Sequence, residues 1–266
     1  MKSIYQQVEY LSLKNKVILI TGGASGIGAA FVEAFVCQDA KVAFLDINED
    51  DALLLQKKFN KKKYKNIFYQ FCDVTDINML KNCIKNIEDK WSGIDILINN
   101  AASDIRHDFI DITQDDWDES INLNLRHYFF AIQSVVDSME KRGGGSIINV
   151  GSISWMQGIS NLICYTTAKA AIHGMTRSLA RQLGEKNIRV NNLIPGAIKT
   201  PKQDKMWEED KKGLKANNSL FIKKQMLKSR LIPSDCARLA LFLASDESYG
   251  CTAQDFIIDA GLLFQD

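Results

Sequence analysis

The 266-residue sequence has almost no net charge, because 33 Lys and Arg residues against 32 Asp and Glu residues leave +1. Without a bulk field to attract phosphates, we expect no nucleic-acid partner and no binding to an anionic bilayer. Long apolar runs are missing as well, since none approaches the ~18 residues that a membrane span needs. The opening residues MKSIYQQVEYLSLKNK lack the apolar stretch of a signal peptide. We therefore expect a cytoplasmic protein that does not engage a membrane.

Metal-binding and disulfide patterns are also missing. The six cysteines form no C-x-x-C pair and no Cys/His cluster, and the three histidines share no ligand spacing. Such patterns are the usual marks of zinc sites and of disulfide frameworks. The sequence thus predicts reduced thiols and no metal site.

Linkers and repeats are absent, and the whole chain holds only three prolines. Short β-branched or aliphatic runs alternate with longer amphipathic ones. The predicted strands are 16–21, 41–45, 67–72, 94–99, 146–151, 188–194 and 255–259, and the predicted helices lie near 26–38, 49–60, 76–91, 113–141, 165–184 and 234–245. Apolar strands that alternate with helices indicate a parallel sheet covered on both faces, with ligands at the carboxyl ends of the strands. We expect one α/β domain over residues 1–266 with a seven-stranded parallel sheet, and residues 1–13 as an N-terminal extension.

A glycine-rich turn, TGGASGIG at residues 21–28, follows the first predicted strand and opens a predicted helix. Glycine permits positive φ and close backbone approach, and a helix N-terminus offers free N–H groups to phosphates. Gly22, Gly26 and Gly28 are spaced four and two apart, unlike the G-x-G-x-x-G fingerprint. The pattern T-G-x-x-x-G-x-G at this place resembles the short-chain dehydrogenase/reductase family. The resemblance implies a single-domain, doubly wound Rossmann-type fold and a dinucleotide cofactor.

Asp46 ends the second predicted strand, eighteen residues after Gly28. A carboxylate at this place can accept hydrogen bonds from both hydroxyls of an adenosine ribose. It would repel the 2′-phosphate of NADP, and neither Gly23 nor Ile47 offers a compensating cation. The sequence therefore favours NAD as the cofactor.

Further cofactor contacts are implied by the family resemblance. CDV (72–74), NNAA (99–102) and PGAIKT (195–200) are similar to family segments that line the dinucleotide site. Ala102 replaces the usual glycine of the second segment, and Ala253 and Ala260 replace glycines near the end of the chain, in TAQDFIIDAG. Besides the three turn glycines and Asp46, the implied cofactor residues are Ser25, Ile27, Ile47, Asp73, Val74, Asn100, Ala101, Ala102, Tyr165, Lys169, Pro195, Gly196, Ile198 and Thr200.

YTTAK, residues 165–169, places a tyrosine and a lysine four positions apart in a predicted helix, so the two side chains share a face. The buried stripe is expected to run through Ala168 and Ile172, with Tyr165 inside its edge and Lys169 just outside. An ammonium near a phenol favours the phenolate, so we expect Lys169 to lower the pKa of Tyr165. A tyrosine tuned in this way can act as a general base.

Four residues, in order along the chain, resemble the catalytic tetrad of the family: Asn124, Ser152, Tyr165 and Lys169. The resemblance implies that Ser152 bonds the reacting oxygen and that Tyr165 moves its proton. It also implies that Lys169 binds the nicotinamide ribose and that Asn124 holds a water. Ser154 and Asn122 are competing candidates, but the spacing to Tyr165 and the N-L pattern of the family favour Ser152 and Asn124.

Residues 198–230 form a Lys-rich segment longer than a connection needs, and we expect it to act as a substrate lid. Trp207 in this segment and Trp155 are candidates to lie over a sugar ring, although ordinary packing explains either equally well. Ser152, Ser154 and Tyr165 complete the predicted substrate contacts. A polar set near the strand ends suits a hydroxyl-rich substrate: Arg106, His107, Ser154, Gln157, Lys202 and Gln203.

Segments such as NNAASDIRH, NLNLRH and KTPKQDK resemble the aldose 1-dehydrogenases of the family, particularly those acting on pentoses such as xylose or arabinose. This resemblance implies NAD-dependent oxidation of a sugar at the anomeric carbon to a lactone, by a homotetramer. A dehydrogenase of another polyol or secondary alcohol is an alternative, as is a 3-oxoacyl reductase, whose NADPH Asp46 disfavours. The non-enzyme alternative is a nucleotide-sensing protein, against which the intact tetrad weighs.

Overall fold

The computed structural model describes residues 4–61, 64, 66–210 and 213–264. Seven parallel strands form one sheet in the order β3-β2-β1-β4-β5-β6-β7. The strands are β1 (Val17–Thr21), β2 (Lys41–Asp46), β3 (Ile67–Phe71), β4 (Ile96–Asn99), β5 (Gly145–Val150), β6 (Ile188–Pro195) and β7 (Asp255–Ile258). The chain winds outward from β1 in one direction and from β4 in the other, which is the doubly wound topology. The predicted fold is confirmed, and every predicted strand end lies within two residues of the observed one.

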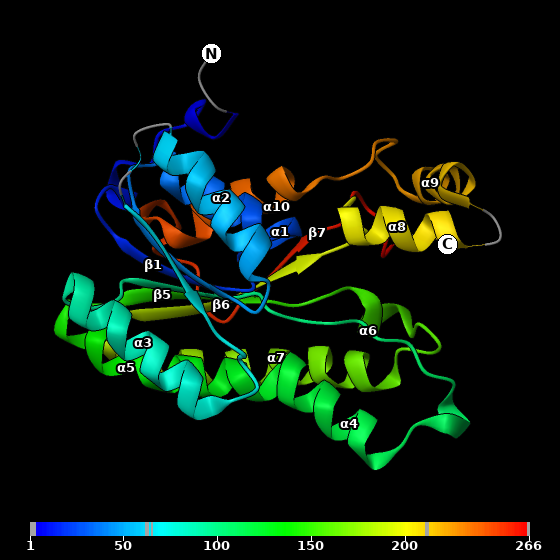
Figure 1. The fold of residues 1–266 in the computed structure, drawn as a ribbon, viewed down its shortest axis with the longest axis horizontal. Coiled ribbons are helices and arrows are strands. Elements are labelled where there is room, and N and C mark those ends of the chain that lie inside the picture. Colours follow the sequence, from blue (N-terminus) through cyan, green and yellow to red (C-terminus); the bar gives the residue numbers. More distant parts are fainter. Residues whose placement is uncertain (1–3, 62–63, 65, 211–212, 265–266) are drawn as a thin grey trace.

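Helices cover both faces of the sheet (Figure 1). One face carries α1 (Gly26–Val36), α2 (Glu49–Lys61) and α10 (Pro233–Ala244), and the other carries α3 (Ile77–Trp91), α5 (His127–Lys141) and α7 (Ile163–Leu183). Successive residues of a strand point to opposite faces, so β1 contributes to both halves of the core. Ile18 and Ile20 join the cluster beneath α1, whereas Val17 and Leu19 join the cluster above α5. The full burial of β1 explains why its sequence shows no polar alternation.

The predicted helix over 113–141 is in fact three segments. α4 (Gln114–Ile121) begins with a capping box between Thr113 and Asp116, a π-helical turn (Asn122–Arg126) follows, and α5 continues. A π turn inserts one extra residue and thereby rotates the side chains that follow it. Hydrophobic periodicity does not report such a local insertion, so the interruption was not predicted.

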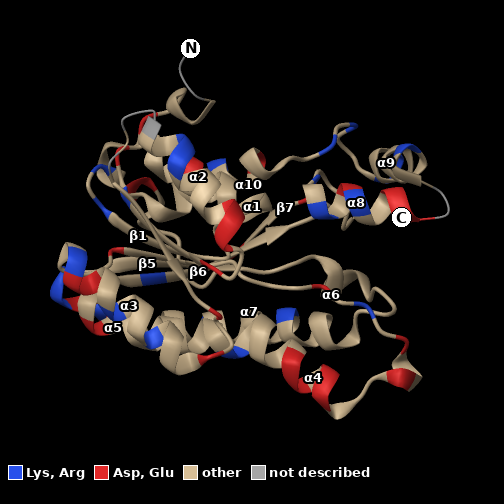
Figure 2. Cartoon of the chain, viewed as in Figure 1, with Lys and Arg blue, Asp and Glu red and all other residues tan. Residues whose placement is uncertain are grey.

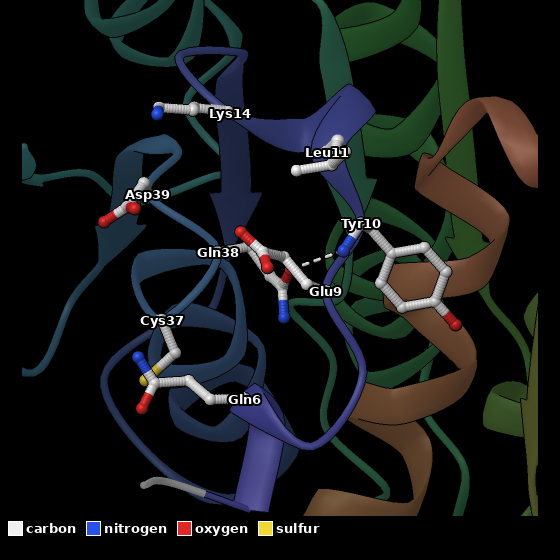
Figure 3. Close-up of a pocket in the computed structure, with 8 residues that line it drawn as sticks. All are labelled: Gln6, Glu9, Tyr10, Leu11, Lys14, Cys37, Gln38 and Asp39. Atoms are coloured by element: carbon white, nitrogen blue, oxygen red, sulfur yellow. Dashed lines mark hydrogen bonds between the residues drawn. The ribbon is translucent and has the colours of Figure 1, made fainter.

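Residues 4–13, the described part of the predicted N-terminal extension, pack onto the domain through two 3₁₀ turns, Ile4–Gln6 and Leu11–Leu13. The side chains of Tyr5 and Leu13 are buried in the core cluster beneath α1. Gln38 fastens the segment, because its Nε2 donates to the carbonyls of Tyr5 and Val8 at 2.6 and 3.0 Å. Its Oε1 accepts from the N–H of Tyr10 at 2.8 Å (Figure 3).

A cavity of about 170 Å³ lies beside this segment and is lined by Gln6, Glu9, Tyr10, Leu11, Lys14, Cys37, Gln38 and Asp39 (Figure 3). Lys14 and Asp39 lie three and two residues before β1 and β2, so the cavity lies at the amino ends of these strands. Ligands of doubly wound sheets bind at the opposite edge. The cavity is therefore remote from the expected site.

The described part of the predicted lid contains α8 (Pro201–Glu209) and α9 (Gly213–Lys224). The Lys202 ammonium lies 2.6 Å from the Asp104 carboxylate and ties α8 to the loop after β4. Acidic and basic side chains alternate along α8, and both signs are mixed over the domain apart from the acidic α4 (Figure 2). None of the described helices combines the length and apolarity needed to cross a membrane.

Candidate active site

The carboxyl ends of the parallel strands bring distant segments to one edge of the sheet. Thr21, Asp46, Asn99, Val150 and Pro195 end β1, β2, β4, β5 and β6, and each is followed by a segment that the sequence marked as functional. The strands are parallel and in register, so these segments converge. Among the described residues, no His/Cys/Asp/Glu cluster here or elsewhere could hold a metal ion.

The glycine turn is a tight cradle between β1 and α1. Gly22 has a φ of +66°, and a Cβ on Gly28 would lie 1.9 Å from the Gly22 carbonyl oxygen. Asn100 holds the turn from β4, because its Nδ2 donates to the carbonyls of Thr21 and Gly22 at 3.0 and 2.9 Å. Ser25 caps α1 without a side-chain hydrogen bond and is exposed, so its hydroxyl and the helix N-terminus face outward. This geometry suits the pyrophosphate of a dinucleotide.

Asp46 lies beside this turn. One carboxylate oxygen accepts from the N–H of Ala24 at 2.8 Å and the other from the N–H of Asn48 at 2.9 Å. Each oxygen keeps a further lone pair, so the carboxylate can still accept ribose hydroxyls. Ile47 beside it is exposed and apolar, and no cation of the described residues pairs with Asp46.

Two further segments that are predicted to line the dinucleotide site follow β3 and β6. After β3, Asp73 is exposed and Val74 is buried, and the Asp73 carboxylate accepts two hydrogen bonds from Thr75. After β6, the Thr200 hydroxyl accepts from the N–H of Gln203 and caps α8. The remaining predicted cofactor residues also lie along this edge: Ile27 in the first turn of α1, Ala101 and Ala102 after β4, and Pro195, Gly196 and Ile198 at and after the end of β6.

Ser152, Ser154 and Tyr165 meet where β5 leads into α6 (Ser154–Gln157) and α7. The Ser152 hydroxyl donates to Ser154 Oγ at 2.9 Å, and its oxygen accepts the Ser154 N–H at 3.2 Å. Burial raises the pKa of Tyr165, the hydrogen bond between Ser152 and Tyr165 lowers it by less, and Asp104 also raises it. The expected lowering of the Tyr165 pKa is therefore wrong for the ligand-free chain. Desolvation of the phenolate outweighs the attraction of nearby groups.

Lys169 lies one turn along α7, on the same side as Tyr165, with its Nζ 5.6 Å from the centroid of the tyrosine ring. The expectation that Lys169 lies just outside the buried stripe is wrong, because the side chain is 1% exposed. Its ammonium donates to the Val150 carbonyl at 2.8 Å and to Tyr128 Oη at 3.0 Å, so the end of β5 and helix α5 cover it. Burial lowers the pKa of Lys169 to about 7.

Asn124 lies inside the π turn and is 1% exposed. Its Oδ1 accepts the Ser103 N–H at 2.9 Å, and its Nδ2 donates to the Ser103 carbonyl at 3.0 Å and to Ser120 Oγ. Asn124 thus braces the loop that follows β4. Its competitor Asn122 instead accepts a hydrogen bond from Arg126 and is only partly buried.

The two tryptophans considered as sugar platforms have different surroundings. Trp207 is 6% exposed, its ring stacks on Phe221 at 4.9 Å, and the Arg230 guanidinium lies 4.8 Å from its centroid. These packing contacts account for the burial of Trp207, and its contact with a substrate stays a prediction. Trp155 is only partly buried, and its indole N–H donates to His173 Nε2 at 2.9 Å.

Two side chains at the site were missed. Tyr128 contacts Lys169 from α5, and His173 holds Trp155 from α7. Each lies four residues after a predicted site residue, Asn124 or Lys169, so helical spacing was the signal that could have found them. Tyrosine and histidine also occur as buried residues with satisfied hydrogen bonds, so the sequence alone did not distinguish these two from core residues.

Comparison with known proteins agrees with this geometry. The family model described as Enoyl-(Acyl carrier protein) reductase matches residues 22–263. D-xylose 1-dehydrogenase of Caulobacter vibrioides is 44% identical over 252 residues, which cover 95% of this chain and 97% of that protein. A probable galactose dehydrogenase of Rhizobium meliloti is 39% identical over 254 residues, with 96% and 97% covered. The solved ligand-free aldohexose dehydrogenase of Thermoplasma acidophilum superimposes with a TM-score of 0.86 at 26% identity, covering 97% of each chain.

Proposed function

Because the chain belongs to the short-chain dehydrogenase/reductase family and is an oxidoreductase that acts on CH–OH groups with a nicotinamide cofactor, we propose that it oxidises an aldose at the anomeric carbon to the lactone. We propose NAD as its cofactor and Tyr165 as its general base. One observation carries the proposal: Ser152, Tyr165 and Lys169 meet at the strand edge that also carries the glycine turn. The similarity to xylose and galactose dehydrogenases supports a sugar as substrate.

The residues present fit a dinucleotide. A side chain on Gly28 would fill the space beside the Gly22 carbonyl, and the exposed start of α1 supplies donors for phosphates. Ser25, Gly26 and Ile27 would hold the pyrophosphate, Asp46 the adenosine ribose, and Thr200 the carboxamide. When bound, an oxidised nicotinamide accepts the hydride that leaves the anomeric carbon.

Ser152 and Tyr165 would handle the sugar hydroxyl. The Ser152 hydroxyl can rotate from its present acceptor, Ser154, and donate to the reacting oxygen. Tyr165 Oη would take the proton from the anomeric hydroxyl as the hydride departs. Burial holds the phenol protonated in the ligand-free chain, so the fraction of competent base, and with it the rate, rises with pH.

Lys169 and Asn124 would support the base. The Lys169 ammonium is the nearby cation that can stabilise a phenolate at Tyr165, and its third N–H is available to a ribose hydroxyl. Asn124 fixes the Ser103 loop, which forms one wall of the same edge. We propose that a water held near Asn124 carries the proton onward to solvent.

We also propose that the protein assembles as a homotetramer and that it is located in the cytoplasm.

The substrate side of the site has polar and aromatic groups. Trp155, Ser154 and Gln157 lie on α6, and Lys202 and Gln203 lie at the start of the lid helix α8. Hydroxyl-rich substrates need several such donors and acceptors around one flat, partly apolar wall. These groups support a sugar over a steroid or an acyl chain.

The decisive experiment is an absorbance screen for NADH or NADPH formation with the purified protein, both cofactors, and panels of aldoses and polyols. We expect turnover of aldoses with NAD, with a lactone detected as product by NMR. Turnover of polyols alone would make the protein a different dehydrogenase. Saturable NAD binding without turnover of any alcohol, aldose or carbonyl compound would indicate a nucleotide-sensing protein.

A further inference from the structure

The ammonium of Lys169 is buried without a compensating negative charge. The side chain is 1% exposed, and among the described residues no carboxylate forms an ion pair with it. An isolated buried ammonium is costly unless hydrogen-bond acceptors replace its water. The few oxygens that contact Nζ therefore determine whether Lys169 stays charged.

Two neutral oxygens perform this role, and they are linked to each other. Nζ donates to the Val150 carbonyl at 2.8 Å and to Tyr128 Oη at 3.0 Å, and Tyr128 Oη in turn donates to the same carbonyl at 3.0 Å. The phenolic hydrogen points to Val150, so the lone pairs of Oη remain for the ammonium. The Tyr128 ring adds a cation–π contact, with its centroid 5.0 Å from Nζ.

The other titratable groups around Lys169 remain neutral. Tyr128 is fully buried, and burial together with the nearby Tyr165 raises its pKa well above 10. The ring centroid of His127 lies 4.6 Å from that of Tyr128. His127 is buried, and burial together with the Lys169 charge lowers its pKa to about 3. Tyr165 on α7 has a raised pKa, to which Asp104 contributes from the loop after β4. Tyr128 is thus the only side chain among the described residues that offers Lys169 a hydrogen-bond acceptor.

We propose that Tyr128 is a positioning residue for the dehydrogenase: its hydroxyl keeps the Lys169 ammonium charged and directed toward Tyr165. The inference rests on the proposed role of Lys169 in the reaction, but the contact itself exists in the ligand-free chain. Helices α5 and α7 cover the same face of the sheet (Figure 1), and Tyr128 on α5 contacts Lys169 on α7. The π turn just before α5 sets the rotation at which Tyr128 meets Lys169.

Removal of the Tyr128 hydroxyl leaves the ammonium with one oxygen acceptor. The charged form of Lys169 then loses a charge-assisted hydrogen bond that the neutral amine does not need. The pKa of Lys169 should consequently fall. The Val150 carbonyl keeps its hydrogen bond from Lys169, so the substitution leaves no buried acceptor without a donor.

The test is an NMR titration of the ligand-free protein labelled with ¹³C at the lysine ε-carbons. The Lys169 signal is assigned by its absence in Lys169→Met. In Tyr128→Phe we expect the pKa of Lys169 to fall by about one unit, a tenfold change in its protonation equilibrium. Tyr249→Phe, which removes a hydroxyl from a ring that is 83% exposed, should leave this pKa unchanged. An unchanged Lys169 pKa in Tyr128→Phe would overturn the proposal.

Two further measurements cover folding and activity. If Tyr128→Phe does not fold, the double variant with Lys169→Met should fold, because it contains no ammonium to satisfy; a double variant that also fails would count against the proposal. In the active enzyme, kcat should be lower in Tyr128→Phe than in the wild type at the same pH, because less Lys169 is charged to stabilise the Tyr165 phenolate. The NMR shift is independent of substrate, so a negative sugar screen with a shifted Lys169 pKa would refute only the proposed function.

Discussion

The indole N–H of Trp155 donates a hydrogen bond to Nε2 of His173 at 2.9 Å. Since Nε2 accepts, the proton of the neutral ring lies on Nδ1, which is 2.9 Å from a carboxylate oxygen of Asp255. The other carboxylate oxygen of Asp255 accepts a hydrogen bond from Asn192 Nδ2 at 2.6 Å. A chain of hydrogen bonds from β6 and β7 therefore fixes the orientation of the Trp155 ring, which follows Ser154 in α6.

His173→Phe should release Trp155 while preserving a ring of similar size. An unpaired buried donor costs ~1–3 kcal/mol, so we expect KM for the aldose to rise about tenfold with a smaller effect on kcat. Steady-state kinetics and the fluorescence of Trp155 measure the two consequences. Tyr249→Phe, at a ring that is 83% exposed, is the control and should leave KM unchanged. An unchanged KM would mean that Trp155 does not contact the sugar.

Tyr165→Phe should lower kcat by a factor of ~10²–10⁴, the usual contribution of a general base, because the ring remains and only the proton acceptor is lost. NAD affinity, measured by calorimetry, should change little. In the wild type, kcat should rise with pH, since burial raises the pKa of Tyr165 and the phenolate is the active form. Substantial residual turnover in the variant would show that another group removes the proton.

Asp46→Asn should weaken the preference for NAD. A carboxylate facing a 2′-phosphate costs several kcal/mol, so the wild type should prefer NAD over NADP by at least about a hundredfold in kcat/KM. The amide keeps the shape of Asp46 and removes its charge, and NADP should gain at least about tenfold relative to NAD. Asp50→Asn, on the first turn of α2, is a control that leaves the ratio unchanged. Equal use of both cofactors by the wild type would refute the assignment of NAD.

The stability of the ligand-free protein should depend on the charge of Lys169. Its folded-state pKa is lowered to about 7 from an ordinary value of 10.5. Between these values the unfolded chain binds a proton that the folded chain does not, so the free energy of unfolding rises with pH, by up to about 1.4 kcal/mol per pH unit. Below pH 7 the buried charge lowers stability by its full amount.

Lys169→Met should remove this rise and should be more stable than the wild type at pH 6, as measured by urea unfolding at a series of pH values. Lys57→Met, an exposed position on α2, should retain the rise. Parallel stability curves for the wild type and Lys169→Met would contradict the burial of a titrating ammonium.

Ala253→Gly should stabilise the protein. Ala253 has a φ of +61°, in the left-handed region, where a Cβ costs ~1–2 kcal/mol. The greater chain entropy of glycine offsets ~0.5–1 kcal/mol of that gain, which leaves a rise in Tm of about 2 °C. Ala216→Gly, at an exposed position in α9, should instead lower Tm, because glycine weakens a helix interior.

The fold and the tight glycine turn after β1 were predictable from the sequence because both depend on local pattern. Runs such as KVILIT and SIINVG indicate buried strands by their apolar continuity. Glycine is required at position 28 because a Cβ there would lie 1.9 Å from the Gly22 carbonyl oxygen. The replacement of glycine at positions 253 and 260 was visible, and the structure shows alanine at both with a φ near +60°. The π turn, by contrast, could not be predicted from the spacing of hydrophobic residues.

The sequence by itself determined the order of the helices and strands and the position of Tyr165 and Lys169 one helical turn apart. It also determined that the predicted site residues gather at the carboxyl ends of the strands. Only the tertiary structure decided how these two groups ionise. A pKa depends on water access and on groups from distant segments, here Tyr128 from α5, the Val150 carbonyl from β5 and Ser152 after it. Spacing along one helix carries no information about that enclosure, which is why the pKa of Tyr165 was expected to fall and is instead raised.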